Sequence, residues 1–252
     1  MSVDTETSGH SRIVTLRWPE KKNSLAPEDA RALTAELEAV GRDETARVLV
    51  LTGDGAFCSG GDLKSFGALS AQLSREEIRS HVYGDIQLVI RRLRDIAMPT
   101  IAAIDGPAIG LGMDLALACD QRFIGPNGWM LQGWARAGLI SATAGSWFIE
   151  QSSPGALWPM LAEQPRLDGP ACELLHLGEC GSPTGLDSAL HRAEQLADVP
   201  KDTLAAYIDL NRRQRWPSDE YLEVCADHQS GFIASERFRT LVSSLLSRNA
   251  GK

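Results

Sequence analysis

Four short stretches of this chain have the polar and apolar pattern of β-strands. Residues 12–18 (RIVTLRW) alternate between polar and apolar side chains, which is typical of a half-buried strand. Residues 48–53 (VLVLTG) and 99–106 (PTIAAIDG) are nearly continuous apolar runs that end in glycine. Such runs indicate strands that are buried on both faces, as in a parallel sheet. Residues 121–125 (QRFIG) predict one more short strand.

Helical patterns occupy the segments between these strands. Apolar residues between positions 30 and 40 recur at helical spacing, behind either Ser24 as a cap or Pro27 as a first-turn residue. A loop at 54–66 (DGAFCSGGDLKSF) precedes a helix predicted to run to about residue 96. The alternation of strands and helices predicts an α/β fold. The polar first ten residues predict a disordered start.

The pattern changes from about residue 185 onward. Four segments there have helical periodicity, at 186–199, 201–215, 219–232 and 235–248. A chain of 252 residues is long enough for one large domain with a substantial core. We therefore predict an α/β core over residues 1–184 and a C-terminal helical region over 185–252.

Composition excludes several classes of partner. A net charge of -8 and the absence of a basic stripe argue against a nucleic-acid-binding surface. The five cysteines form no CxxC pair and have no histidine at zinc-ligand spacing, so we expect free thiols and no metal. No apolar run is long enough for a membrane span. We expect a cytoplasmic protein that does not bind membranes.

Candidate chemistry begins with two glycine-rich turns, one within 54–66 and one at 105–112 (DGPAIGLG), each following a predicted buried strand. The second turn does not match the GxGxxG dinucleotide fingerprint, and no P-loop occurs. Glycines let backbone N–H groups approach a ligand closely, and a helix N-terminus adds partial positive charge. Two such turns can each supply one N–H to the same oxygen, which would form an oxyanion hole.

Four segments have a distinctive sequence, at residues 23–33 (NSLAPEDARAL), 48–66, 98–125 (MPTIAAIDGPAIGLGMDLALACDQRFIG) and 230–246 (SGFIASERFRTLVSSLL). They resemble the crotonase, or enoyl-CoA hydratase/isomerase, superfamily, and the resemblance extends from Arg12 to Arg248. The resemblance implies a spiral of ββα units with a C-terminal helical region that serves trimer contacts. It also implies an acyl-CoA thioester substrate, no separate cofactor, and a homotrimer or hexamer.

The resemblance also implies site residues. The oxyanion-hole donors are the backbone N–H groups of Ser59 and Leu111. Hydratases of the family use two glutamates, and their positions are occupied here by Asp114 and Trp134. Substrate contacts are implied for Cys58, Gly60, Asp62, Gly110, Trp134 and His81.

Departures from the family pattern limit the chemistry. Without a second glutamate, Asp114 must manage proton transfer alone. Trp134 resembles the 4-chlorobenzoyl-CoA dehalogenase branch, but that branch needs an aspartate at the position of Ala142. The usual GLxPGxGG segment reads GLISATAGS at 138–146, so the acyl end of the site is rebuilt.

Simpler interpretations remain open for several of these residues. Asp114 can be a helix N-terminal acid favoured by the macrodipole, and Trp134 can be a packing residue that forms a pocket wall. Cys58 and Ser59 have no placed histidine base for nucleophilic catalysis. His81 can be simply solvent-exposed.

Three functions compete at this point. The first is an acyl-CoA enzyme of the hydratase, isomerase or lyase kind, with Asp114 as its single acid/base. The second is a catalytically reduced CoA-ester-binding protein or auxiliary subunit. The third is an enzyme that hydrolyses a non-CoA β-dicarbonyl compound.

Overall fold

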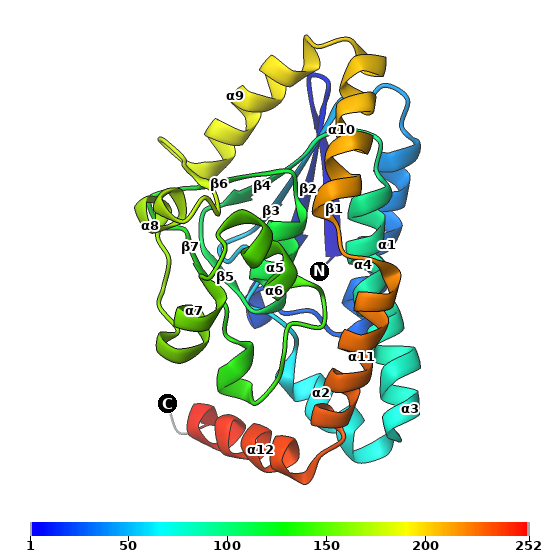
Figure 1. The fold of residues 1–252 in the computed structure, drawn as a ribbon, viewed down its shortest axis with the longest axis vertical. Helices are drawn as coiled ribbons and strands as arrows, with labels where there is room; N and C mark the ends of the chain where they lie inside the picture. The colour runs from blue at the N-terminus through cyan, green and yellow to red at the C-terminus, as the bar shows by residue number, and fades with distance from the viewer. Residues whose placement is uncertain (1, 251–252) are drawn as a thin grey trace.

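The computed structural model describes residues 2–250 and has the predicted α/β architecture (Figure 1). Within those residues, a six-stranded sheet has the order β1-β2-β3-β4-β6-β8, and β5 pairs with β7 separately. β1 and β2 are antiparallel, whereas the other neighbouring strands are parallel. The strands are β1 (Ser2–Ser8), β2 (Ser11–Arg17), β3 (Val48–Gly53), β4 (Thr100–Ile104), β5 (Pro107–Ile109), β6 (Gln121–Ile124), β7 (Trp129–Leu131) and β8 (Glu179–Cys180).

Helices cover both faces of the sheet. They are η1 (Pro19–Lys21), α1 (Pro27–Arg42), α2 (Leu63–Gln72), α3 (Arg75–Glu77), η2 (Ile78–Val82), α4 (Tyr83–Asp95), α5 (Leu111–Ala118), η3 (Trp134–Ala137), α6 (Gly145–Ser152), α7 (Leu157–Glu163), α8 (Gly169–Leu174), α9 (Gly185–Ala197), α10 (Lys201–Arg215), α11 (Asp219–Ile233) and α12 (Glu236–Ala250).

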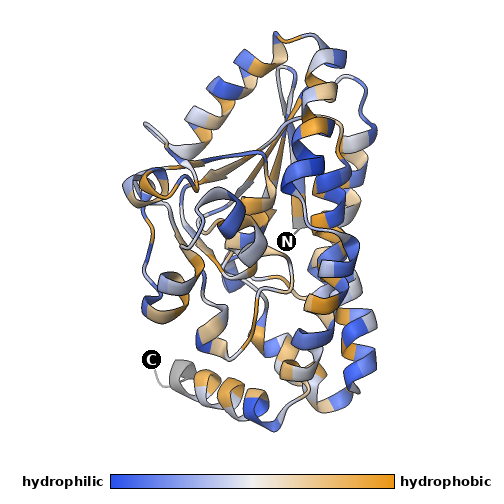
Figure 2. Ribbon diagram, viewed as in Figure 1, coloured by the Kyte–Doolittle hydropathy of each residue, from blue (hydrophilic) through white to orange (hydrophobic). Residues whose placement is uncertain are grey.

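The continuous apolar runs predicted as buried strands are β3 and β4. Val48 and Val50 face one cluster, which includes Ala189 and Ala193 of α9. The intervening residues of β3 belong to the larger cluster on the opposite face, with residues of α1 and α4. Because side chains alternate along a strand, a run that is apolar at every position requires cover on both faces. Figure 2 shows the apolar colouring concentrated on these central strands.

The predicted disordered start is wrong. Ser2–Ser8 forms β1, which pairs with β2 along its whole length through a turn at Gly9 and His10. Polar residues dominate β1 because it is an edge strand that exposes most of its side chains, so its hydrophobic pattern is weak.

The single helix predicted to reach residue 96 is interrupted. α2 ends at Gln72, and Ser74 starts α3 by accepting a hydrogen bond from the Glu77 N–H. A π-helical turn, η2, then leads into α4. The Ser74–Glu77 capping box is a helix-start signal within the segment, which the periodicity alone does not reveal.

The four C-terminal helices are confirmed as α9 to α12. α9 packs on the sheet, α11 packs on η2 and α4, and α12 packs on α2 (Figure 1). The helical region therefore contributes directly to the core and to the walls of the molecule. None of the helices within residues 2–250 has the length and apolar character of a membrane span.

Candidate active site

The two glycine-rich turns that follow β3 and β4 lie against each other. Cys58 in the first turn forms a parallel bridge with Ala108 in the second, and its carbonyl accepts the Ile109 N–H at 2.9 Å. A Cβ atom on Gly112 would overlap the Cys58 carbonyl oxygen, and one on Gly106 would overlap the backbone of the first turn. Glycine is required at these two positions because the backbones touch.

The paired turns carry the two N–H groups expected to form an oxyanion hole. Leu111 is the first residue of α5, and its N–H has no hydrogen-bond acceptor among residues 2–250. The Ser59 N–H donates to the Lys22 carbonyl at 3.0 Å. Gly60 lies directly against the second turn, since a Cβ built on it would be 2.8 Å from the Ile109 carbonyl oxygen and 3.8 Å from the Leu111 nitrogen. One donor is thus open and the other is engaged.

Asp114 lies one helical turn after Leu111, so its side chain projects from the same side of α5. The residue is only 3% exposed. Its Oδ2 atom accepts three side-chain hydrogen bonds, from Trp134 Nε1 (2.9 Å), Ser141 Oγ (2.8 Å) and Thr143 Oγ1 (2.5 Å). Its Oδ1 atom faces Gly145, the first residue of α6, where a Cβ would overlap it. Three donors saturate Oδ2, which leaves Oδ1 as the freer atom for proton transfer.

Burial and hydrogen bonding act in opposite directions on this carboxyl group. Burial raises the pKa of Asp114 to about 6, while the hydrogen bonds from Thr143, Ser141 and Trp134 lower it. The net result is an acid whose charge changes near neutral pH, which is the range that suits a general acid/base.

Trp134 was predicted as a wall of the site, and its position is more specific than that. It begins η3, is buried, and donates its indole N–H to Asp114. Its ring also lies against Gly110, where an added Cβ would be 3.4 Å from Trp134 Cε2. Sequence reasoning missed Ser141 and Thr143 as partners of Asp114. The altered GLISATAGS segment was the available signal, because it places hydroxyl groups beside the carboxylate.

The other predicted site residues lie at different places in the fold and have different local roles. Cys58 is buried, and burial raises the pKa of its thiol to about 12, so it is a poor nucleophile. Asp62 caps α2 by accepting the Lys64 and Ser65 N–H groups. His81 is exposed on η2, and the structure does not bring it to Asp114.

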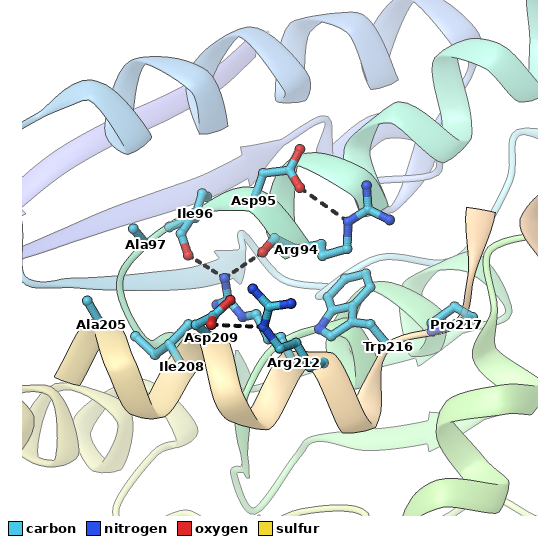
Figure 3. A pocket seen from close by; sticks show the side chains of 11 residues that line it. Arg94, Asp95, Ile96, Ala97, Ala205, Ile208, Asp209, Arg212, Trp216 and Pro217 are labelled. Atoms are coloured by element: carbon cyan, nitrogen blue, oxygen red, sulfur yellow. Dashed lines mark hydrogen bonds and ion pairs between the residues drawn. The ribbon is translucent and has the colours of Figure 1, made fainter. Parts of the chain in front are cut away.

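A separate cavity of about 510 Å³ lies between the end of α4 and α10 (Figure 3). Its arginines are already paired with acids or backbone carbonyls. Arg94 binds Asp95, and Arg212 donates to the carbonyls of Arg94 and Ile96. No residue that lines the cavity belongs to the Asp114 cluster. These contacts anchor α10 on the core, so the cavity is not the candidate active site.

The buried carboxyl group predicts a pH-dependent stability difference. Its folded-state pKa of about 6 lies above the ordinary value of 3.8, so its stabilising contribution is present below pH 4 and lost as pH rises through 6. At pH 8, the free energy of unfolding of Asp114→Asn is therefore expected to exceed that of the wild type by about 2–3 kcal/mol. At pH 4 the two proteins should be nearly equal in urea titrations. An equally large difference at both pH values would contradict the assignment, and the exposed Asp202→Asn variant is the control.

The paired turns, the N–H without an acceptor at the start of α5 and the buried Asp114 carboxyl group together form the candidate active site on an α/β fold. A sequence profile described as enoyl-CoA hydratase/isomerase matches residues 8–157. The chain belongs to this family. Its fold matches the crystal structure of an enoyl-CoA hydratase/isomerase from Mycobacterium paratuberculosis with a TM-score of 0.87, at 23% identity and over 96% of this chain and 98% of that chain.

Two further relatives are informative. An enoyl-CoA hydratase from Polaromonas sp. JS666 is 27% identical with a TM-score of 0.79, over 98% of each chain. The (E)-benzylidenesuccinyl-CoA hydratase of Thauera aromatica is 39% identical over 129 residues, which are 50% of this chain. The chain spans 48% of that relative's length and 61% of a related mycobacterial protein.

Proposed function

We propose that this protein processes an acyl-CoA thioester by hydratase, isomerase or lyase chemistry, with Asp114 as its only acid/base. The Leu111 N–H and the Ser59 N–H would hold the thioester oxygen, which makes the α-proton acidic and stabilises the enolate. To use Ser59, the thioester oxygen must replace the Lys22 carbonyl as acceptor. Oδ1 of Asp114 would then remove or return the proton.

The observation that carries this proposal is the position of Asp114. A buried acid with a pKa of about 6 lies one turn from an N–H that has no acceptor in the described part of the chain. Family relatives that are named for enoyl-CoA hydration support the thioester as ligand. A carboxylate that served only as a helix N-terminal charge would not need three side-chain donors on one oxygen.

The ligand is tested by thermal unfolding with crotonyl-CoA and with crotonate. A ligand at 100 times its Kd stabilises the folded state by about 2.7 kcal/mol. We expect crotonyl-CoA to raise the melting temperature and crotonate to leave it unchanged, because the proposed site holds a thioester oxygen between the two turns and the CoA part adds further contacts. Equal shifts for both compounds would remove CoA from the proposal.

A second candidate function is a CoA-ester-binding protein with reduced catalysis. It is favoured because two groups of the site already have hydrogen-bond partners within the protein. These groups are Oδ2 of Asp114 and the Ser59 N–H. This candidate predicts thermal protection by crotonyl-CoA without turnover of any enoyl-CoA thioester by the wild-type protein.

We also propose that the protein acts as a homotrimer or hexamer in a reducing compartment such as the cytoplasm. Large apolar side chains stand exposed on several helices, which supports contacts with further copies. They include Trp158, Leu174, Tyr207 and Leu210. All five cysteines are free, which supports the reducing compartment.

A further inference from the structure

Two buried hydrogen-bond donors near Asp114 have no acceptor. The Tyr83 hydroxyl and the Gln229 Nε2 atom are without a hydrogen-bond partner in the described structure, although Tyr83 is 1% exposed and Gln229 is fully buried. Leaving a buried polar group unpaired costs about 1–3 kcal/mol. Such groups call for an explanation, and an absent ligand atom is one.

The orientation of the Gln229 amide is fixed by its other end. Its Oε1 atom accepts the Ile140 N–H at 2.9 Å, so Nε2 is the free end and offers its N–H groups. Burial raises the pKa of the Tyr83 hydroxyl, and the Gln229 amide is close enough to oppose part of that rise without forming an aligned hydrogen bond. The two donors are therefore neighbours.

The segment that binds Asp114 connects both donors to the candidate active site. Ile140, whose N–H donates to Gln229, precedes Ser141, which donates to Asp114, and Gln87, one helical turn after Tyr83 on α4, donates to the Ala142 carbonyl. Tyr221, Cys225 and Gln229 are spaced four residues apart, so they share one face of α11. Burial raises the pKa of Tyr221, of Cys225 and of Tyr83, and the negative charge of Asp114 adds a smaller contribution in the same direction. Tyr221 also hydrogen-bonds with Ser146 at the start of α6 (3.1 Å). The α11 face thus lies within electrostatic reach of Asp114 and contacts the segment 138–146, which departs from the family pattern.

We infer that Tyr83 and Gln229 recognise an uncharged oxygen, such as a keto oxygen, on the acyl group of the substrate. The inference rests on the proposed thioester function. A purely hydrocarbon chain would leave both donors unpaired, whereas a keto oxygen can accept from both. A carboxylate is disfavoured, because Asp114 is the nearby charge and no cation contributes to its pKa within residues 2–250.

The test compares acyl-CoA thioesters whose acyl groups are similar in size by calorimetric titration. 3-Oxopentanoyl-CoA and 4-oxopentanoyl-CoA carry the oxygen, pentanoyl-CoA lacks it, and succinyl-CoA carries a charge in the same space. We expect at least one oxo compound to bind about 3- to 10-fold more tightly than pentanoyl-CoA, the effect of one or two neutral hydrogen bonds. Succinyl-CoA should bind more weakly than that oxo compound.

Tyr83→Phe, alone and combined with Gln229→Met, is expected to remove this preference. Tyr83→Phe should do so without lowering the melting temperature, because the lost hydroxyl has no partner. Tyr207→Phe, at an exposed tyrosine, should keep both preference and stability. The inference is overturned if neither oxo compound is preferred by the wild-type protein, or if the preference survives in Tyr83→Phe. Failure of all the thioesters to bind would instead overturn the proposed function itself.

Discussion

Replacing Asp114 by asparagine is expected to lower turnover of an enoyl-CoA thioester by roughly 10²- to 10⁴-fold, the usual contribution of a general acid/base. Asparagine keeps the shape and can still accept from Trp134, Ser141 and Thr143, so the site should remain assembled. Binding should survive, because the predicted oxyanion donors are backbone N–H groups. The measurement is kcat together with the Kd for a non-reacting thioester such as pentanoyl-CoA.

The matched control for that experiment is Asp202→Asn, which makes the same chemical change at an exposed position. It should retain the wild-type kcat. An Asp114→Asn protein with the wild-type rate would refute the assignment of Asp114 as the acid/base. Loss of thioester binding together with turnover would point to a positioning role for Asp114.

Trp134 puts a hydrogen-bond donor where the hydratases of the family are expected to have a second carboxylate. A carboxylate at that position would repel the negative charge of Asp114 and raise its pKa. Here the second position carries Trp134, whose indole N–H stabilises the charged form of Asp114 instead. The hydroxyls of Ser141 and Thr143 add to that effect. The side chains at 114, 134 and 141 therefore form one hydrogen-bonded group, and the proposed chemistry would use a single proton carrier.

Sequence patterns predicted the parts of this fold that depend on burial. β3 and β4 were recognisable because a strand covered on both faces must be apolar at every position. β1 was missed because an edge strand is held mainly by backbone hydrogen bonds to β2, which do not select apolar side chains. β5, β7 and β8 have two or three residues each, too few to show a period.

The candidate site was predictable to a similar extent. The resemblance to the family located Asp114, Trp134 and the two turns. In the structure, the Trp134 indole donates a hydrogen bond to the Asp114 carboxyl group. Partners from distant segments were not predictable, because their contacts depend on tertiary packing. The Lys22 carbonyl that engages Ser59 and the α11 face that approaches Asp114 are two examples.

The largest expected effect on folding is that of Gly112→Ala. The added methyl group would overlap the Cys58 carbonyl oxygen, which is backbone and cannot turn aside as a side chain could. Relief requires the two turns to separate, which breaks the bridge between Cys58 and Ala108. We expect a loss of more than about 3 kcal/mol in the free energy of unfolding, measured by urea titration.

Gly84→Ala is the matched control, because Gly84 and Gly112 are each the second residue of a helix. Nothing lies within 4 Å of a Cβ built on Gly84, and its φ is not in the left-handed region. The same substitution should therefore stabilise the protein there by about 0.5–1 kcal/mol through helix propensity. If Gly112→Ala unfolded within 1 kcal/mol of the wild-type protein, the close contact of the two turns would not be the reason for glycine at that position. The glycines would then have to be explained by the ligand alone, through the approach of backbone N–H groups to the thioester oxygen.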